Sequence, residues 1–322
     1  MRAIEVASFG GPEVLSLAEL PEPVAGPGQV VVDVAAADVI FLDTLLRGGW
    51  GQDFFPRTLP YVPGGGGAGT VVQVGDGVDP AWIGRRVAAR AGTGYAERIV
   101  ADVEEVVPVP DGLDVEAAAA LVHDGVTALR FDRLGAPDKG EWVLVLAAAG
   151  GAGTLLVQLA ADAGARVVAA ASSDAKRALA RELGAEITVD YTRPDWIGRV
   201  RAATGGGAAL VYDGAGGALG TAAVDAVADG GRYVTYGTAE GFAAPDATAT
   251  ARRGVRVFTP LRDGRPDRTT VRELLGLVLH RAAQGRLRPA VTATYPLERA
   301  ADAHRALASR TSVGKSLLLL GG

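Results

Sequence analysis

Residues 142–160 read WVLVLAAAGGAGTLLVQLA, two apolar runs joined by a glycine-rich turn. The first run, Trp142–Leu146, has the aliphatic composition of a strand that is buried on both faces. The second run leads into a predicted helix over 155–163. The turn between them reads Ala148-x-Gly150-x-x-Gly153, a dinucleotide-binding fingerprint with alanine in the first position. Strand, turn and helix together predict one unit of a parallel α/β sheet.

Each position of the turn has a predicted physical role. Gly150 lets the backbone approach a pyrophosphate, and Gly153 lets the helix pack closely on the strand. The N-terminus of the helix offers unpaired N–H groups and a partial positive charge to the phosphates. We therefore predict a dinucleotide cradle, made by Ala148, Gly150, Gly151, Ala152 and Gly153.

The end of the next predicted strand, 167–171, indicates which dinucleotide binds. An NAD site usually places an acid there to hold the ribose 2′-hydroxyl. Here the strand is followed by Ser172, Ser173, Asp174, Ala175, Lys176 and Arg177. Hydroxyls and cations suit a 2′-phosphate, so NADPH is the predicted cofactor. Two points stay open: both cations could simply be solvated, and Asp174 could cap the helix or weaken phosphate binding.

The pattern around this turn extends the α/β interpretation. Residues 141–236 alternate predicted strands and helices, as expected of a doubly wound parallel sheet. Residues 1–120 are mostly β, with a short helix at 43–47 and an aromatic loop at 48–63. The remaining predictions are strands at 4–9, 30–34, 69–74, 186–189, 209–212, 231–236 and 314–320, and helices at 115–121, 175–183, 271–284 and 297–307.

Length and composition narrow the class of protein. With 322 residues the chain exceeds one usual hydrophobic core, so two domains are predicted. The chain has no cysteine, which excludes disulfides, thiolate zinc sites and a cysteine nucleophile. The net charge of −5, without a dense run of Lys and Arg, argues against nucleic-acid binding. A serine hydrolase is not favoured either, because no G-x-S-x-G elbow occurs.

The location is predicted from two segments. Glu5 stands where a signal peptide needs an apolar core, so a cytoplasmic protein is expected. The longest apolar stretch, 142–161, is interrupted by the glycine turn, so it is interpreted as a strand and a helix start and not as a membrane span.

Motifs spread over the whole chain resemble the medium-chain dehydrogenase/reductase superfamily, and within it the zinc-free quinone oxidoreductase (zeta-crystallin-like) branch. The motifs that carry this resemblance are FGGPEVL at 9–15, AAAGGAG at 147–153, ARELGA at 180–185, VYD at 211–213, YPL at 295–297 and AHRAL at 303–307.

The resemblance implies an architecture and an activity. A GroES-like catalytic domain, 1–122, would be completed by 262–322, with a Rossmann domain, 123–261, between these segments. It implies NADPH-dependent hydride transfer to quinones or α,β-unsaturated carbonyl compounds, without metal, by a homodimer. Two alternatives remain: a biosynthetic tailoring enzyme with different or redox-neutral chemistry, and a non-catalytic NADPH-binding protein.

The resemblance also assigns individual residues. Lys176, Tyr191 and Arg310 match positions that hold the 2′-phosphate, Thr127 matches a residue near the nicotinamide ribose, and Gly237 follows the strand that leads toward the nicotinamide. Ile40 and Gly65 stand at positions that are zinc ligands in other members, and neither residue can coordinate zinc.

The substrate pocket is expected to be unusually apolar. Ile40 and Leu45 replace the usual Asn and Tyr, so a proton donor must come from elsewhere. Tyr61 and Tyr95 are candidate substrate contacts. His123 and Asp124 are the candidate catalytic pair, the alternative being that His123 packs and Asp124 caps a helix. His280 and His304 are expected to be structural.

Overall fold

The computed structural model describes residues 1–262, 264 and 266–320, and its chain divides into two compact units. The first unit comprises Met1–Val126 and Asp267–Gly322, and the second comprises Thr127–Pro266. The sequence-based boundaries at 122 and 262 lie slightly earlier than these.

The first unit is built on a seven-stranded sheet with the order β14-β15-β3-β4-β5-β7, and β6 also pairs with β3. A separate hairpin is formed by β1 and β2. The strands are β1 Arg2–Val6, β2 Leu15–Glu19, β3 Gln29–Val39, β4 Gly66–Val74, β5 Arg86–Arg90, β6 Arg98–Asp102, β7 Val106–Pro108, β14 Val291–Pro296 and β15 Lys315–Leu319. The helices are α1 Phe41–Arg47, α2 Val115–Leu121, α9 Arg268–Ala283 and α10 Ala300–Ala308, and α3 Asp124–Gly135 begins in this unit.

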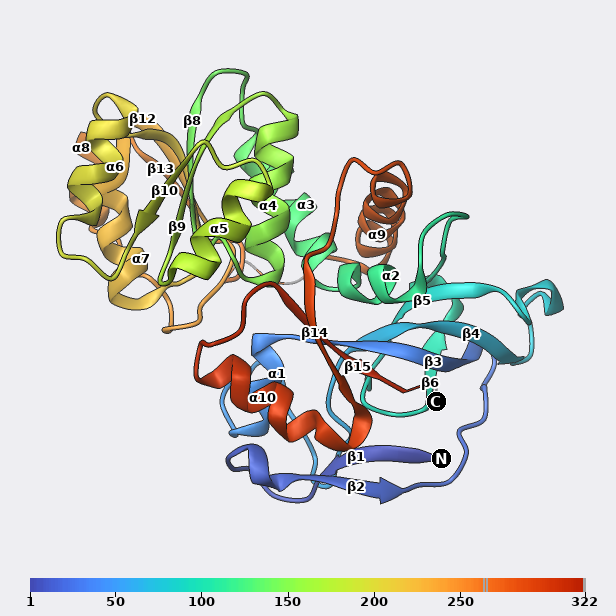
Figure 1. Cartoon of the computed structure of the whole chain (residues 1–322). Helices are drawn as coiled ribbons and strands as arrows, with labels where there is room; N and C mark the ends of the chain where they lie inside the picture. Colours follow the sequence, from blue (N-terminus) through green and yellow to red (C-terminus); the bar gives the residue numbers. More distant parts are fainter. Residues whose placement is uncertain (263, 265, 321–322) are drawn as a thin grey trace. The chain divides into compact units, whose positions relative to one another are not determined.

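The C-terminal segment is an integral part of this first unit. Strand β15 lies beside β3 (Figure 1). The two strands pair antiparallel, with Leu317 opposite Asp38. Leu318, Ala300 and Ala303 join the same apolar core as Val32. The two ends of the chain therefore build one sheet, which places Lys315 near residues at the far end of the sequence.

The second unit is a parallel sheet with the strand order β10-β9-β8-β11-β12-β13. This order is that of a Rossmann fold, in which the sequence runs outward from a central strand in both directions. The strands are β8 Trp142–Leu146, β9 Arg166–Ala171, β10 Ile187–Asp190, β11 Ala208–Asp213, β12 Val227–Thr235 and β13 Arg256–Phe258. The helices are α4 Gly151–Asp162, α5 Asp174–Glu182, α6 Trp196–Thr204, α7 Gly217–Ala223 and α8 Ala247–Arg252. The predicted α/β doubly wound class is confirmed.

Some predicted boundaries are corrected. The fingerprint helix starts at Gly151 and not at Leu155, because a helix N-terminus tolerates glycine where it binds a ligand. The helix expected over 297–307 splits into a 3₁₀ turn, Leu297–Arg299, and α10. Among the described residues, no helix has both the length and the apolar character needed to cross a membrane.

Candidate functional site

The fingerprint turn adopts the geometry that its sequence predicts. Strand β8 ends at Leu146, Ala147 takes a positive φ of 51°, and Gly150 is the N-cap of α4 without a side-chain hydrogen bond. A Cβ atom on Gly150 would meet only the Ala147 carbonyl oxygen, at 3.4 Å. The backbone at Gly150 is therefore open to a ligand, at the end of a helix whose dipole favours an anion.

Gly153 has a different role from Gly150. A Cβ atom on Gly153 would lie 2.3 Å from the Ala147 carbonyl oxygen and 2.9 Å from the Tyr236 hydroxyl. That hydroxyl donates to the Leu146 carbonyl at 2.6 Å. Only glycine fits where α4, β8 and Tyr236 meet, so Gly153 fixes the position of the helix on the strand.

The end of β9 places a lysine beside a serine. Ser173 is the N-cap of α5 and accepts from the Lys176 N–H. The Lys176 ammonium donates to the Ser172 hydroxyl at 3.5 Å. The possible capping role of Asp174 is wrong, since Asp174 is the first residue of the helix and its side chain is exposed.

Arg177 is not a solvated cation. Its guanidinium donates to the Ala171 carbonyl at 3.1 Å and pairs with Asp174 and Asp190. Its side chain is mostly buried. Arg177 therefore ties α5 to β9 and β10, and Lys176 is the cation next to the two serines.

The other predicted cofactor residues fall in different places. Thr127 lies on α3, Tyr191 follows β10, and Gly237 follows β12, all within the second unit. Arg310 belongs to the first unit, where it has a positive φ of 56° and is exposed after α10.

In the first unit, His123 is bound to a carboxylate that the sequence does not single out. Its Nδ1 lies 2.9 and 3.1 Å from the two carboxylate oxygens of Asp38 near the end of β3. Asp38 is 1% exposed, and the His123 side chain is 14% exposed. This geometry has Nδ1–H donating to Asp38, which fixes the tautomer of the ring.

Asp124 has a separate partner. The Lys315 ammonium donates to the Asp124 carboxylate at 2.7 Å, to the Asp38 carboxylate at 3.4 Å and to the Val39 carbonyl at 3.2 Å. Lys315 is 3% exposed. Thus His123 and Asp124 do not bind each other. They belong to one cluster because Asp38 and Lys315 bridge them, and the Asp124 side chain, in the first turn of α3, is bound by Lys315.

The charges of this cluster shift its pKa values. Burial alone would raise the pKa of Asp38, but His123 and Lys315 outweigh burial and lower it to about 2. Burial would lower the pKa of Lys315, but Asp124 and Asp38 raise it instead. Asp38 is therefore ionised and Lys315 protonated at neutral pH.

A second buried chain of hydrogen bonds runs through α1 and α10. Arg47 Nη1 lies 3.1 Å from His304 Nδ1, His304 Nε2 lies 2.9 Å from the Tyr95 hydroxyl, and that hydroxyl donates to Asp43 at 3.0 Å. A neutral His304 satisfies every contact, since Nδ1 accepts from Arg47 and Nε2–H donates to Tyr95.

The pKa values of these hydrogen-bonded groups agree with the directions of their hydrogen bonds. Burial, together with the charge of Arg47, lowers the pKa of His304 to about 3. Burial and the nearby Asp38 raise the pKa of Asp43 to about 6. Burial raises the pKa of Tyr95 well above its usual value. His304 is thus neutral and structural, as the sequence analysis expects.

The predicted substrate residues differ in exposure. Ile40, the N-cap of α1, and Leu45, within that helix, are half-buried. Tyr61 is half-buried too, and its buried hydroxyl forms no hydrogen bond with any described residue. Tyr95 is 0% exposed and is bound to Asp43 and His304. The structure therefore gives Tyr95 a role in the core and not in contact with a substrate.

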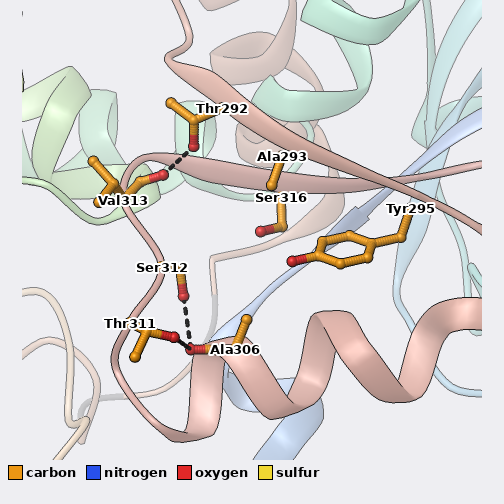
Figure 2. A pocket seen from close by; sticks show the side chains of 8 residues that line it. All are labelled: Thr292, Ala293, Tyr295, Ala306, Thr311, Ser312, Val313 and Ser316. Atoms are coloured by element: carbon orange, nitrogen blue, oxygen red, sulfur yellow. Dashed lines mark hydrogen bonds between the residues drawn. The ribbon is translucent and has the colours of Figure 1, made fainter.

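The first unit also has an open pocket with a volume of about 300 Å³, lined largely by hydroxyl groups. Figure 2 shows that Tyr295 and Ser316, from β14 and β15, face the loop that carries Ser312. Ser312 and Thr311 both donate to the Ala306 carbonyl, at 3.0 and 3.3 Å. This pocket contains neither His123 nor Ile40, so it is separate from the buried cluster.

Fold and site together define a dinucleotide-binding protein with a second, β-rich unit that carries buried acid–base groups. Two family models match the chain: the alcohol dehydrogenase GroES-like domain over residues 26–111, within the first unit, and the zinc-binding dehydrogenase over 151–278, mostly in the second. A quinone oxidoreductase of Pseudomonas aeruginosa is 33% identical, covering 99% of both chains. A 2-haloacrylate reductase of a Burkholderia species is 31% identical, covering 96% of both chains.

A solved structure is similar over the same length. The Escherichia coli quinone oxidoreductase complexed with NADPH has a TM-score of 0.91 and 28% identity, covering 99% of this chain and 100% of that one. The chain belongs to the medium-chain dehydrogenase/reductase superfamily, in its quinone oxidoreductase branch. The predicted family and its GroES-like plus Rossmann fold are confirmed.

Sequence reasoning missed Asp38, Lys315 and Asp43 as members of buried networks. A weak signal exists, since Asp38 interrupts an apolar strand and Lys315 opens the run KSLLLL. Buried charges need partners, but the partners lie far apart in the sequence and only the sheet pairing identifies them.

Proposed function

We propose that this protein is an NADPH-dependent reductase that transfers hydride to quinones or α,β-unsaturated carbonyl compounds without a metal ion. One observation supports this proposal above the others. The open fingerprint turn of α4 is followed, at the end of β9, by Ser172 and Lys176 in hydrogen-bonding contact and by no acid on the strand. A lysine and a serine bind a 2′-phosphate, whereas an acid there would repel it.

The acceptor class rests on family and on pocket composition. The similarity to quinone oxidoreductases and to a 2-haloacrylate reductase supports activated C=C bonds and quinones as acceptors. Ile40, the N-cap of α1, and Leu45, within that helix, supply apolar side chains, which favours a hydrophobic substrate.

The bound NADPH would supply the hydride, from C4 of its nicotinamide. The backbone of Gly150 and Gly151 would hold the pyrophosphate, and Ser172, Ser173, Lys176 and Tyr191 of the same unit the 2′-phosphate end. Thr127 and Gly237 would lie near the nicotinamide. The first unit would contribute Arg310 to cofactor binding and His123 and Asp124 to catalysis.

A panel assay tests the proposal. Purified protein is mixed with NADPH or NADH and with simple enones, acrylates and quinones, and oxidation of the cofactor is followed by the loss of its near-ultraviolet absorbance. We expect turnover with NADPH and a clear preference over NADH. NADPH binding without turnover of any acceptor would instead favour a non-catalytic binding protein.

The metal-free part has its own test. Ile40 and Gly65 have no side-chain atom that coordinates zinc, so we expect activity to survive prolonged treatment with chelators. Activity that is lost to a chelator and restored by zinc would contradict this. The predicted cytoplasmic location and homodimer belong to the same proposal, and light scattering of the purified protein checks the dimer.

A further inference from the structure

The two ring nitrogens of His123 differ in their contacts: Nδ1 is hydrogen-bonded to a buried carboxylate and Nε2 is not. Nδ1 faces both oxygens of Asp38, at 2.9 and 3.1 Å. Within residues 1–262, 264 and 266–320, the hydrogen bonds of His123 are all made by Nδ1. A buried carboxylate that holds the first nitrogen orients the ring and leaves Nε2 for proton transfer.

Gly65 lies directly against the second nitrogen. A Cβ atom on Gly65 would be 2.8 Å from His123 Nε2 and 2.9 Å from Cε1. Gly65 has no left-handed φ, so its backbone does not require glycine. The reason for glycine at this position is therefore the imidazole, which fills the space that a side chain at residue 65 would need.

The charged groups around His123 come from three elements. Asp38 from β3 and Asp124 from α3 are acidic, and Lys315 from β15 is basic. Two acids and one base surround the ring. Asp43 from α1 is the remaining nearby acid, since its electrostatic interactions include both Asp38 and His123.

We propose that Asp38 and His123, with the imidazole seated on Gly65, form the proton-donating dyad of this enzyme, with Asp38 as its positioning residue. The inference rests on the proposed reductase function. Hydride from C4 of NADPH forms a C–H bond at the β-carbon of an enone, and the C=C electron pair moves to give an enolate. The Nε2–H bond of His123 then breaks, its proton goes to the enolate, and the neutral imidazole takes a new proton from water.

Enones and quinones should respond differently to loss of the dyad. A quinone gains aromaticity when it accepts hydride, so its reduction depends less on a proton donor. We expect His123→Asn to reduce kcat with an enone by about 100-fold, the usual contribution of a general acid. Quinone reduction and NADPH affinity should change little. The matched control is His280→Asn, because His280 is an exposed histidine on α9 that binds only Gln284 among the described residues.

The pH profile separates a proton donor from a structural histidine. With the wild type, enone turnover should fall at alkaline pH, because the proton that the donor gives to the enolate becomes scarce. The longer side chain of His123→Gln brings a non-titrating amide N–H close to the place of Nε2, which Asn does not reach. This N–H can hydrogen-bond to the enolate, so His123→Gln should restore part of the turnover and remove that alkaline limb. Equal losses with enones and quinones, or an unchanged limb in His123→Gln, would overturn the proposal.

Two further variants test the positioning by Asp38 and Gly65. Asp38→Asn removes the charge but keeps the volume, and should shift the alkaline limb to lower pH. Gly65→Ala retains both dyad residues but displaces the ring, and should lower enone turnover while quinone turnover persists. Full enone activity in both variants would exclude the dyad.

Nuclear magnetic resonance makes the dyad testable without turnover. In the unliganded wild type, with signals assigned through His123→Asn, Nδ1 should stay protonated while Nε2 titrates, and Asp38→Asn should change that pattern. If the wild type oxidises no NADPH with any acceptor but this pattern holds, the proposed function fails and the dyad remains. If Nδ1 is the nitrogen that titrates, the dyad fails regardless of turnover.

Discussion

The two units bury different kinds of groups. Among the Asp, Glu, Lys, Arg and His residues that the structure describes, the first unit buries Asp38, Asp43, Arg47, His304 and Lys315, whereas the second buries only Asp213. The second unit makes its binding turn from backbone and glycine, within one stretch of sequence. The first unit makes its acid–base groups from side chains on β3, α1, α10 and β15. A turn that is made by adjacent residues keeps its shape when residues elsewhere in the sequence are substituted. A cluster of buried charges that come from several elements is destabilised when any one of its members is substituted.

Removing Lys315 should have the largest effect, since it leaves two carboxylates without their shared ammonium. We expect Lys315→Met to lower the free energy of unfolding by about 3–5 kcal/mol, as for other broken buried pairs, measured by urea titration. Lys139→Met, at an exposed lysine of the second unit, is the control and should change little. The double variant Lys315→Met/Asp124→Asn should recover part of the loss. Stability equal to the wild type in Lys315→Met would refute the ionic cluster.

The pH dependence of stability should expose His304. Its folded pKa of about 3 lies below the ordinary value, so between these values the unfolded chain binds more protons and stability falls as pH falls. By pH 4 the lost contribution amounts to about 3 kcal/mol. His304→Gln cannot gain this proton, so its instability relative to wild type should be greatest at pH 7 and shrink toward pH 4.

The opposite slope of Asp43 does not remove that difference. Its pKa, raised to about 6, makes the folded chain bind more protons than the unfolded chain between pH 4 and 6, in the wild type and the variant alike. The comparison is therefore the difference between the two unfolding curves at each pH. A difference that does not vary with pH would mean that His304 is already charged in the fold.

The two glycines of the fingerprint should separate stability from binding. Gly153→Ala places a methyl group 2.3 Å from the Ala147 carbonyl oxygen and should cost about 1–3 kcal/mol, as overpacking does. Gly150→Ala meets that oxygen only at 3.4 Å, so it should fold normally and weaken NADPH binding. Thermal unfolding and NADPH titration of both variants check this, and the reverse outcome would show that the two roles are assigned wrongly.

Lys176→Ala should have the smallest effect of these variants. It should weaken only the binding of the 2′-phosphate, which NADPH has and NADH lacks. Loss of one charge-assisted hydrogen bond should weaken NADPH binding about tenfold and leave NADH binding nearly unchanged. Arg177→Ala is the matched control, because Arg177 already binds Asp190 and the Ala171 carbonyl. It should lower stability without changing the preference between cofactors. Equal losses of NADPH and NADH in Lys176→Ala would remove the argument for a 2′-phosphate site.

By itself, the sequence determined the second unit. Gly150, Gly153 and the apolar strand before them are adjacent in the chain, and the conformations that they need are local, so spacing alone predicted strand, turn and helix. It also placed helix α2 at Val115–Leu121 and found His123 and Asp124 as residues of interest. It could not name their partners, because ionic contacts leave no periodic pattern in a sequence.

The tertiary structure decided the first unit. Antiparallel pairing of β15 with β3 brings Lys315 to Asp38, two residues that are 277 positions apart. In the same packing, the Tyr95 hydroxyl is hydrogen-bonded to Asp43 and His304. Tyr95 is therefore a residue of the core, whereas the sequence predicted a substrate contact. The physical reason is that a buried charge is stable only beside its partner, and which partner it meets depends on how the two ends of the chain pair in one sheet.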